Sequence, residues 1–244
     1  MCRMVGVVYR GAFPTGTLRD LQHVSEIGRI PDEEEPGHND GWGIVSFMAG
    51  SPRYVGRSPR PMRMDPSFDS ALAEIPKLSS PNILIAHARA ASAGGAKMEN
   101  THPFIVDGMV LGHNGTVYDL GPPKRTKPKG ESDSEILAIL VAERFEEKRD
   151  LRSAMKSVIT EELATKKFSA AILLASDGRK LYGYRDYADE AKADYYDLRM
   201  ARCAEYVVLF QQTFVGYAGD VLQLRRGELA SVSLDLSVER EMVR

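Results

Sequence analysis

One of the two cysteines, Cys2, directly follows the initiator methionine at the head of the apolar run M-C-R-M-V-G-V-V-Y. Removal of Met1 would leave a residue that carries both a thiol and a free α-amine. A thiolate is a strong nucleophile, and an α-amine, with an ordinary pKa of about 7.7–8.0, suits a general base at neutral pH. The position therefore allows catalysis by an N-terminal cysteine, although a small hydrophobic residue near a terminus would look the same.

An arginine stands in the apolar, alanine-rich stretch I-L-I-A-H-A-R-A-A-S-A-G-G. Alternation along the strand expected over residues 83–91 puts Ile85, His87 and Arg89 on one face. A buried guanidinium needs an anionic partner. That partner is either an acidic side chain of the protein or the carboxylate of a substrate, which arginine can hold by two parallel hydrogen bonds.

Three further segments carry residues that could touch a substrate. Asn114 and Gly115 favour a hairpin turn locally, but the asparagine amide and the following backbone N–H could also donate to an oxyanion. Glycine at that point would let the backbone approach a ligand closely. His102 precedes a proline, which favours extended backbone, and is either a core residue or a substrate contact. Asp133 is expected in the first turn of a helix, where it stabilises the helix or receives a substrate ammonium.

The spacing of the histidines gives no support for a metal site. The chain has five histidines, without the H-E-x-x-H spacing of a zinc helix and without a C-x-x-C pair. We therefore expect neither a metal nor a cofactor.

Asp-Gly and Asn-Gly pairs indicate an antiparallel β protein. Three pairs separate apolar runs: F-I-V-D-G-M-V-L-G, V-L-G-H-N-G-T-V-Y and A-I-L-L-A-S-D-G-R-K-L-Y. Such pairs favour the turns of two-residue hairpins, which need positive φ at their central residues. We expect hairpins at 107–108, 114–115 and 177–178.

Three segments have helical patterns. Residues 15–28 end at a glycine, a common helix stop, and present one apolar face, made of Leu18, Leu21, Val24 and Ile27. The next segment begins with Ser132 and Glu135 at the spacing of a capping box, and a third runs over residues 150–163. Helices set among antiparallel strands predict an α+β fold.

Composition bounds the function without choosing it. A chain of 244 residues with 43% hydrophobic residues suits one domain over 1–244. The 32 basic and 34 acidic residues argue against nucleic-acid binding. No segment has the ~18 consecutive apolar residues of a membrane helix, and the N-terminus lacks the pattern of a signal peptide. With only two cysteines, we expect a cytoplasmic protein without membrane contact.

The order of the short motifs is more specific than any one of them. Along the chain come M-C-R, D-G-W-G, A-H-A-R-x-x-S, N-x-H-P-F, G-H-N-G-T-V and S-D-S-E. This order resembles the class II glutamine amidotransferases of the N-terminal nucleophile hydrolase superfamily, and it is most similar to their stand-alone members. The likeness runs from Cys2 through at least the helix after Asp133. It implies a four-layer αββα sandwich of two antiparallel sheets.

The resemblance also implies a reaction. In the family, an N-terminal cysteine attacks the side-chain amide of glutamine, a thioester forms with loss of ammonia, and water then releases glutamate. It assigns the nucleophile to Cys2 and the oxyanion hole to Asn114 and Gly115. The implied substrate-binding residues are Arg89 for the α-carboxylate, Asp133 for the α-ammonium, Ser92 in place of a threonine of the family, and His102 at the pocket wall.

Several alternatives stay open. Ala90 and Ala93 stand where many members have tryptophan and histidine, so the substrate is glutamine or another γ-glutamyl amide with a larger leaving group. A third interpretation is a catalytically silent glutamine-binding protein of the same fold. In an active enzyme, ammonia goes to a partner enzyme, because the remaining chain is too short for a synthase domain, or the reaction ends as hydrolysis. The loops 31–40 and 121–131 are surface connections or lids, and no oligomeric state is predicted.

Overall fold

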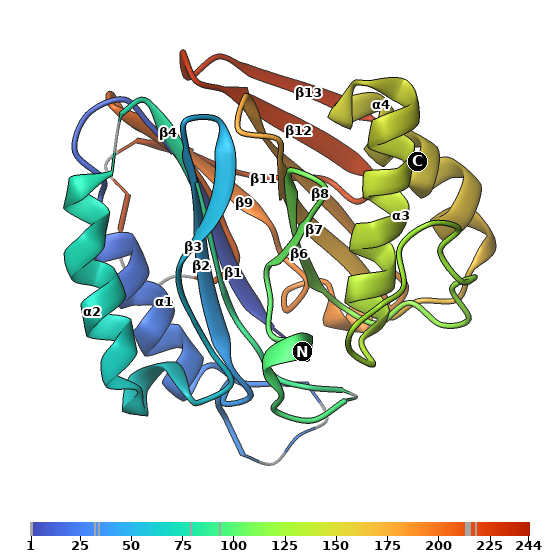
Figure 1. Cartoon of the computed structure of the whole chain (residues 1–244), viewed down its shortest axis with the longest axis horizontal. Coiled ribbons are helices and arrows are strands. Elements are labelled where there is room, and N and C mark those ends of the chain that lie inside the picture. The colour runs from blue at the N-terminus through green and yellow to red at the C-terminus, as the bar shows by residue number, and fades with distance from the viewer. Residues whose placement is uncertain are drawn as a thin grey trace.

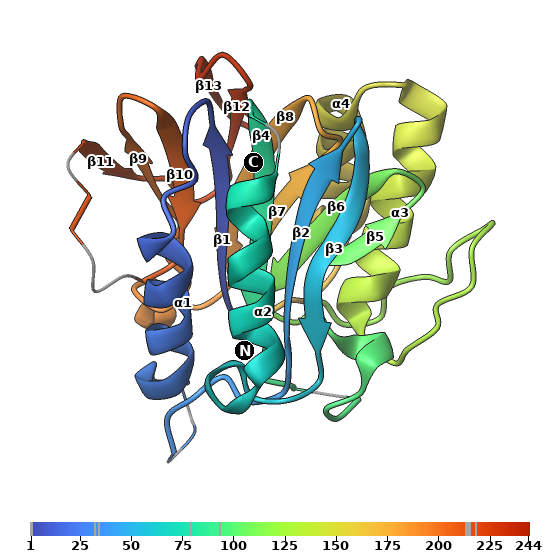
Figure 2. The same ribbon diagram turned by 60° about the vertical axis from the view of Figure 1, so that its left-hand side comes forward.

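The computed structural model describes residues 2–31, 33, 35–78, 80–92, 94–212, 216–217 and 219–244. Two antiparallel β-sheets lie face to face, and a pair of helices covers the outer face of each (Figures 1 and 2). This is the predicted α+β fold, a four-layer αββα sandwich.

The first sheet has seven strands in the order β11-β9-β10-β1-β4-β2-β3. Its two central strands, β1 and β4, are buried on both faces because a helix layer covers one side and the second sheet the other. The sequences of these two strands are therefore nearly continuous apolar runs. The strands are β1 (Arg3–Tyr9), β2 (Trp42–Met48), β3 (Ser51–Ser58), β4 (Asn82–Ala88), β9 (Arg199–Arg202), β10 (Tyr206–Phe210) and β11 (Asp220–Gln223).

The second sheet has six strands in the order β13-β12-β8-β7-β6-β5. Two of its hairpins turn at the predicted Asp-Gly pairs, at 107–108 between β5 and β6 and at 177–178 between β7 and β8. The strands are β5 (Phe104–Val106), β6 (Met109–Asn114), β7 (Ala170–Ser176), β8 (Lys180–Tyr187), β12 (Glu228–Ser233) and β13 (Val238–Met242).

Four α-helices form the outer layers, α1 and α2 on the seven-stranded sheet and α3 and α4 on the six-stranded sheet (Figure 1). Their bounds are α1 (Gly16–Ile27), α2 (Pro66–Glu74), α3 (Asp133–Lys148) and α4 (Leu151–Ser157). A π-helical turn, η4 (Val158–Glu162), extends α4. Short 3₁₀ turns complete the elements: η1 (Met62–Met64), η2 (Ile75–Lys77), η3 (Met98–Asn100), η5 (Leu163–Thr165) and η6 (Glu190–Lys192).

Three of the four α-helices were predicted and one was not. α1 buries Leu18, Leu21 and Val24 as expected, but Ile27 at its end is 44% exposed. The helix α2 was missed, although Asp65 caps it by accepting from the Ser67 N–H at 3.0 Å and a proline occupies its first position.

Apolar side chains fill the three spaces between the four layers. Ile85, Ile172 and Leu174 belong to the cluster between the sheets. Leu18 and Phe68 help to attach α1 and α2 to the first sheet, and the second sheet packs against α3 and α4 through a separate cluster. Each fully buried large aliphatic side chain contributes roughly 1.5–3 kcal/mol, so the sheets form a rigid base for the residues at their ends.

Two further properties concern the described residues only. None of their helices is long and apolar enough to cross a membrane. Within the same residues, no group of three or more His, Cys, Asp or Glu side chains is arranged to hold a metal ion.

Candidate active site

The residues singled out in the sequence come together at one end of the two sheets. Because β1 and β4 are antiparallel, with Arg3 opposite Ala88, the start of β1 lies beside the end of β4. The end of β6 and the start of α3 reach the same point. Six of the seven predicted site residues line one small pocket there, namely Cys2, Arg89, Ser92, His102, Gly115 and Asp133.

The seventh residue, Asn114, contacts Cys2 directly. The Cys2 backbone nitrogen donates to Asn114 Oδ1 at 2.8 Å. Cys2 is 5% exposed, and its Sγ lies 3.8 Å from the carbonyl oxygen of Ala90. Asn114 is fully buried. Its amide nitrogen Nδ2 donates to Gln211 Oε1 at 3.3 Å.

The hairpin expected at Asn114 and Gly115 does not form. Asn114 is the last residue of β6, and the chain then leads away to α3 before β7 returns to pair with β6. Gly115 has φ +136°, and a Cβ at this position would lie 1.9 Å from the Ala170 carbonyl oxygen. Glycine is therefore needed here for the close approach of the backbone to the Ala170 carbonyl, and the role of the pair toward a substrate oxyanion stays a prediction.

Arg89 lies one residue beyond the end of β4, where it is 2% exposed. Its Nη1 donates to the Gly95 carbonyl at 2.6 Å and lies 3.5 Å from the Asp40 carbonyl. The backbone of Arg89 is also fixed on both sides, because its N–H donates to Gly41 and its carbonyl accepts from Asp40. The guanidinium is thus held in place at the pocket wall.

Asp133 begins α3, as predicted. Its Oδ2 accepts from the Val117 N–H at 2.7 Å and lies 3.9 Å from His113 Nδ1. Burial lowers the pKa of His113, while the charge of Asp133 acts in the opposite direction. The carboxylate side chain stays 21% exposed, so it combines a fixed position with access from outside.

His102 is buried against a second histidine. Its ring stacks on His87 at 4.3 Å between centroids and meets the edge of Phe104 at 4.7 Å. Among the described residues, neither ring nitrogen of His102 has a hydrogen-bond partner. Burial holds the pKa of His102 well below its ordinary value and lowers that of His87 to about 3. Both rings are therefore neutral at pH 7, and His102 offers unpaired polar atoms at the pocket.

Ser92 occupies the rim. It is exposed, and its hydroxyl lies 3.2 Å from the Thr116 hydroxyl. Ala93, one of the two departures from the family pattern, lies outside the described residues, as does Met1. The free volume of the pocket is about 10 Å³, roughly the space that one water molecule needs.

Three residues at the site were not identified from the sequence. Asp40 Oδ2 accepts from the Ala91 N–H at 2.7 Å, which fixes the chain beyond Arg89. Arg3 donates to the Cys2 carbonyl at 3.3 Å while its guanidinium lies 3.8 Å from the centre of the Tyr195 ring. Gln211 contacts Asn114. Asp40 stands in D-G-W-G at the end of the loop 31–40, and two glutamines after the apolar run Y-V-V-L-F were the available signal for Gln211.

The basic loop 121–131 is tied to α3 by two buried carboxylates. Glu135 accepts from the backbone N–H groups of Lys129 and Gly130 at 2.9 and 2.7 Å, and Glu143 accepts from that of Arg125 at 2.7 Å. Glu135 does not reach back to the helix start as a capping box requires, and Ser132 instead accepts from the Ser134 N–H.

Comparison with known proteins shows the family of the chain. A profile described as "Glutamine amidotransferases class-II" matches residues 16–206. An uncharacterised protein of Methanocaldococcus jannaschii is 29% identical over 197 residues, which are 77% of this chain and 51% of that protein. A candidate glutamine amidotransferase of Escherichia coli is 35% identical over 107 residues, 40% of this chain and 39% of that protein. The chain spans about half or less of the length of these relatives.

Solved structures share the fold at low sequence identity. A glutamine aminotransferase class-II domain protein of Silicibacter pomeroyi superposes with a TM-score of 0.62 at 16% identity and covers 98% of both chains. The glutamine phosphoribosylpyrophosphate amidotransferase of Bacillus subtilis gives a TM-score of 0.63 at 18% identity, over 100% of this chain and 49% of that one.

Proposed function

The chain belongs to the class II glutamine amidotransferases, and we propose that it hydrolyses the side-chain amide of glutamine through an N-terminal cysteine thioester. The observation that carries the proposal is the position of Cys2, whose nitrogen lies 2.8 Å from Asn114 Oδ1 in a pocket that Arg89 and Asp133 also line. The same end of the two sheets thus holds a nucleophile, an amide donor, a cation and an anion, which are Cys2, Asn114, Arg89 and Asp133.

In the proposed mechanism, loss of Met1 gives Cys2 a free α-amine. This amine takes the proton of the thiol, and the thiolate forms a bond to the side-chain carbonyl carbon of glutamine while the π electrons move to oxygen. An N–H of Asn114 and the backbone N–H of Gly115 donate to the resulting oxyanion. Removing one such donor in other enzymes costs about 10²–10³-fold in rate.

Collapse of the tetrahedral intermediate releases ammonia. The proton held by the Cys2 ammonium passes to the amide nitrogen, the C–N bond breaks, and a thioester remains. Water then gives a proton to the amine and attacks the thioester carbon. The C–S bond breaks, the Cys2 ammonium returns its proton to the leaving sulfur, and the free amine and the thiol are restored as glutamate leaves. The same amine thus serves twice as base and twice as acid.

The substrate is held at its α-carbon by opposite charges. The guanidinium of Arg89 receives the α-carboxylate, for which its planar fork is suited, and Asp133 receives the α-ammonium. Ser92 and the neutral His102 contact the substrate from the rim and the wall of the pocket. We include in the proposal a single domain over residues 1–244 and a separate enzyme that accepts the ammonia.

The test compares two cysteine variants of the purified chain. Cys2→Ala should abolish release of glutamate from glutamine while the melting temperature stays close to that of the wild type, because alanine fills most of the space of a small buried side chain. Cys203→Ala, which changes the other cysteine, should keep full activity. Full glutaminase activity in Cys2→Ala would overturn the proposal.

A further inference from the structure

Gln211 connects the proposed oxyanion donor to the body of the protein. It directly follows β10, which pairs with β1, and its N–H donates to the Met4 carbonyl at 3.2 Å. The side chain is 1% exposed. Its Oε1 accepts from Asn114 Nδ2 at 3.3 Å, and its Nε2 donates to the Asp197 carbonyl at 3.1 Å.

These contacts allow only one orientation of each amide. A backbone carbonyl accepts and never donates, so the NH₂ end of Gln211 must face Asp197 and its oxygen must face Asn114. Asn114 then turns its own NH₂ group to Gln211 and its oxygen to the Cys2 nitrogen. Within the described residues, one N–H of Asn114 is used by Gln211 and the other makes no hydrogen bond, which leaves it for a substrate oxygen.

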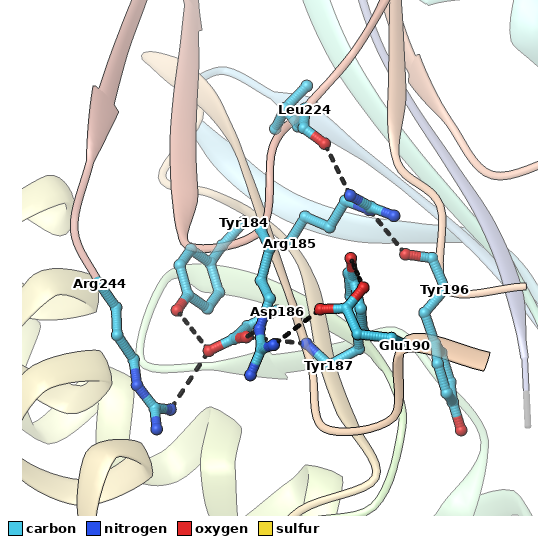
Figure 3. A network of polar contacts seen from close by, with 9 residues as sticks. Tyr184, Arg185, Asp186, Tyr187, Glu190, Tyr196, Leu224 and Arg244 are labelled. Carbon is cyan, nitrogen blue, oxygen red and sulfur yellow. Dashed lines mark hydrogen bonds and ion pairs between the residues drawn. The ribbon is translucent and has the colours of Figure 1, made fainter. Parts of the chain in front are cut away.

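The carbonyl that orients Gln211 belongs to a firmly held segment. Figure 3 shows Arg185 donating to the carbonyls of Tyr196 and Leu224. The two hydrogen bonds measure 2.8 and 3.0 Å, and Tyr196 directly precedes Asp197 in the chain. A third donor nitrogen of Arg185 reaches the Ala193 carbonyl at 2.9 Å. Because Arg185 is itself buried in β8, the segment that orients Gln211 is attached to the second sheet, while Gln211 is attached to the first.

We propose that Gln211 is a positioning residue that fixes the carboxamide of Asn114, so that its oxygen meets the Cys2 nitrogen and one N–H is kept for the oxyanion. This inference rests on the proposed function. It adds a residue that was not recognised from the sequence and that does not line the substrate pocket.

A role in orienting the oxyanion donor has a specific kinetic signature. The oxyanion exists only after attack, so a misplaced donor lowers kcat and leaves KM for glutamine nearly unchanged. A purely structural role of Gln211 would instead lower the melting temperature and reduce the fraction of active enzyme without a consistent split between kcat and KM.

The test uses two substitutions of Gln211 and one matched control. Gln211→Met keeps the size of the side chain and removes both of its amide hydrogen bonds. We expect kcat to fall about 10- to 100-fold, because a misplaced oxyanion donor should cost no more in rate than the complete loss of one donor. Gln211→Glu keeps an acceptor toward Asn114 and should retain more of kcat than the methionine variant. Gln223→Met, at an exposed position of β11, should match the wild type. An unchanged kcat in Gln211→Met, or a loss confined to KM, would overturn the inference.

A second readout does not depend on turnover. The rate at which iodoacetamide alkylates Cys2 depends on the reactivity of the thiol and on the nitrogen beside it. It is measured by peptide mass, with Cys203 as the internal reference. Gln211→Met should change the rate and pH profile at Cys2 but not at Cys203, and Gln223→Met should change neither. If the wild type hydrolyses no γ-glutamyl amide, the proposed function fails, but a selective change at Cys2 still supports the positioning role. An identical alkylation profile in wild type and Gln211→Met refutes that role, whatever the turnover.

Discussion

Substitution of Gly115 by alanine tests whether the backbone at the proposed oxyanion hole is as constrained as its geometry requires. The new Cβ would lie 1.9 Å from the Ala170 carbonyl oxygen and 3.0 Å from His113 Nε2, at a φ of +136°. The first distance is far below any real contact, so one of the two backbone segments has to shift. Strained backbone costs about 1–3 kcal/mol, and overpacking of a buried site costs a further amount of about 1–3 kcal/mol.

We therefore expect the unfolding free energy to fall by about 2–6 kcal/mol. For a chain of this size, each kcal/mol lowers the melting temperature by roughly 2–4 °C. Because a displacement of about 1 Å in a positioned group can cost ~10²-fold in rate, kcat should fall by at least that factor. Calorimetry and a glutaminase assay measure the two effects. Gly108→Ala is the matched control, since Gly108 has φ +81° and open space around it. If Gly115→Ala behaves like Gly108→Ala in both assays, the reasoning is refuted.

Three further predictions concern the substrate, the pH dependence and the basic loop. Arg89→Lys keeps the charge but loses the planar fork, so KM for glutamine should rise about tenfold or more with kcat within about threefold; an unchanged KM would contradict the carboxylate role. Burial holds the pKa of His102 below its unfolded value, so below about pH 6.5 the unfolded chain binds a proton that the folded chain does not. The unfolding free energy should then fall with falling pH, by up to about 1.4 kcal/mol per unit per such group, and His102→Phe should flatten this slope in chemical denaturation; equal slopes would count against it. Glu135→Gln weakens the anchoring of Lys129 and Gly130, so trypsin should cut the 121–131 loop faster, and an unaltered cleavage rate would show that this anchor is dispensable.

Local chemistry explains which parts of the fold could be predicted. The hairpins at 107–108 and 177–178 were predicted because Asp-Gly pairs favour turns with positive φ. Both residues of the first pair have positive φ, whereas in the second only Gly178 does, and Ser176 pairs with Leu181 across a longer turn. The same rule failed at 114–115, because the strand that pairs with β6 is β7, which follows α3 and α4 in the chain. Sequence patterns predicted three of the four α-helices but not their layering, which was expected only through the resemblance to a family.

The site was predicted residue by residue only where a motif marked it. Cys2, Arg89 and Asp133 stand in recognisable segments, whereas Gln211 acts on Asn114 from 97 positions away in the chain. That contact arises because β10 lies beside β1, and no local pattern encodes strand order. The capping-box reading of Glu135 failed for a similar reason, since its carboxylate is used by the loop that precedes α3.

The most direct test of the account is the intact mass of the purified chain before and after treatment with 6-diazo-5-oxo-L-norleucine, a glutamine analogue that alkylates such cysteines. We predict loss of Met1 and a single adduct that peptide mapping places on Cys2. A chain that has lost Met1 but gains no adduct would indicate that the substrate is another γ-glutamyl amide and not glutamine. A chain that keeps Met1 and gains no adduct, or gains it on Cys203, would contradict the claim that Cys2 is the nucleophile of a glutamine-shaped site.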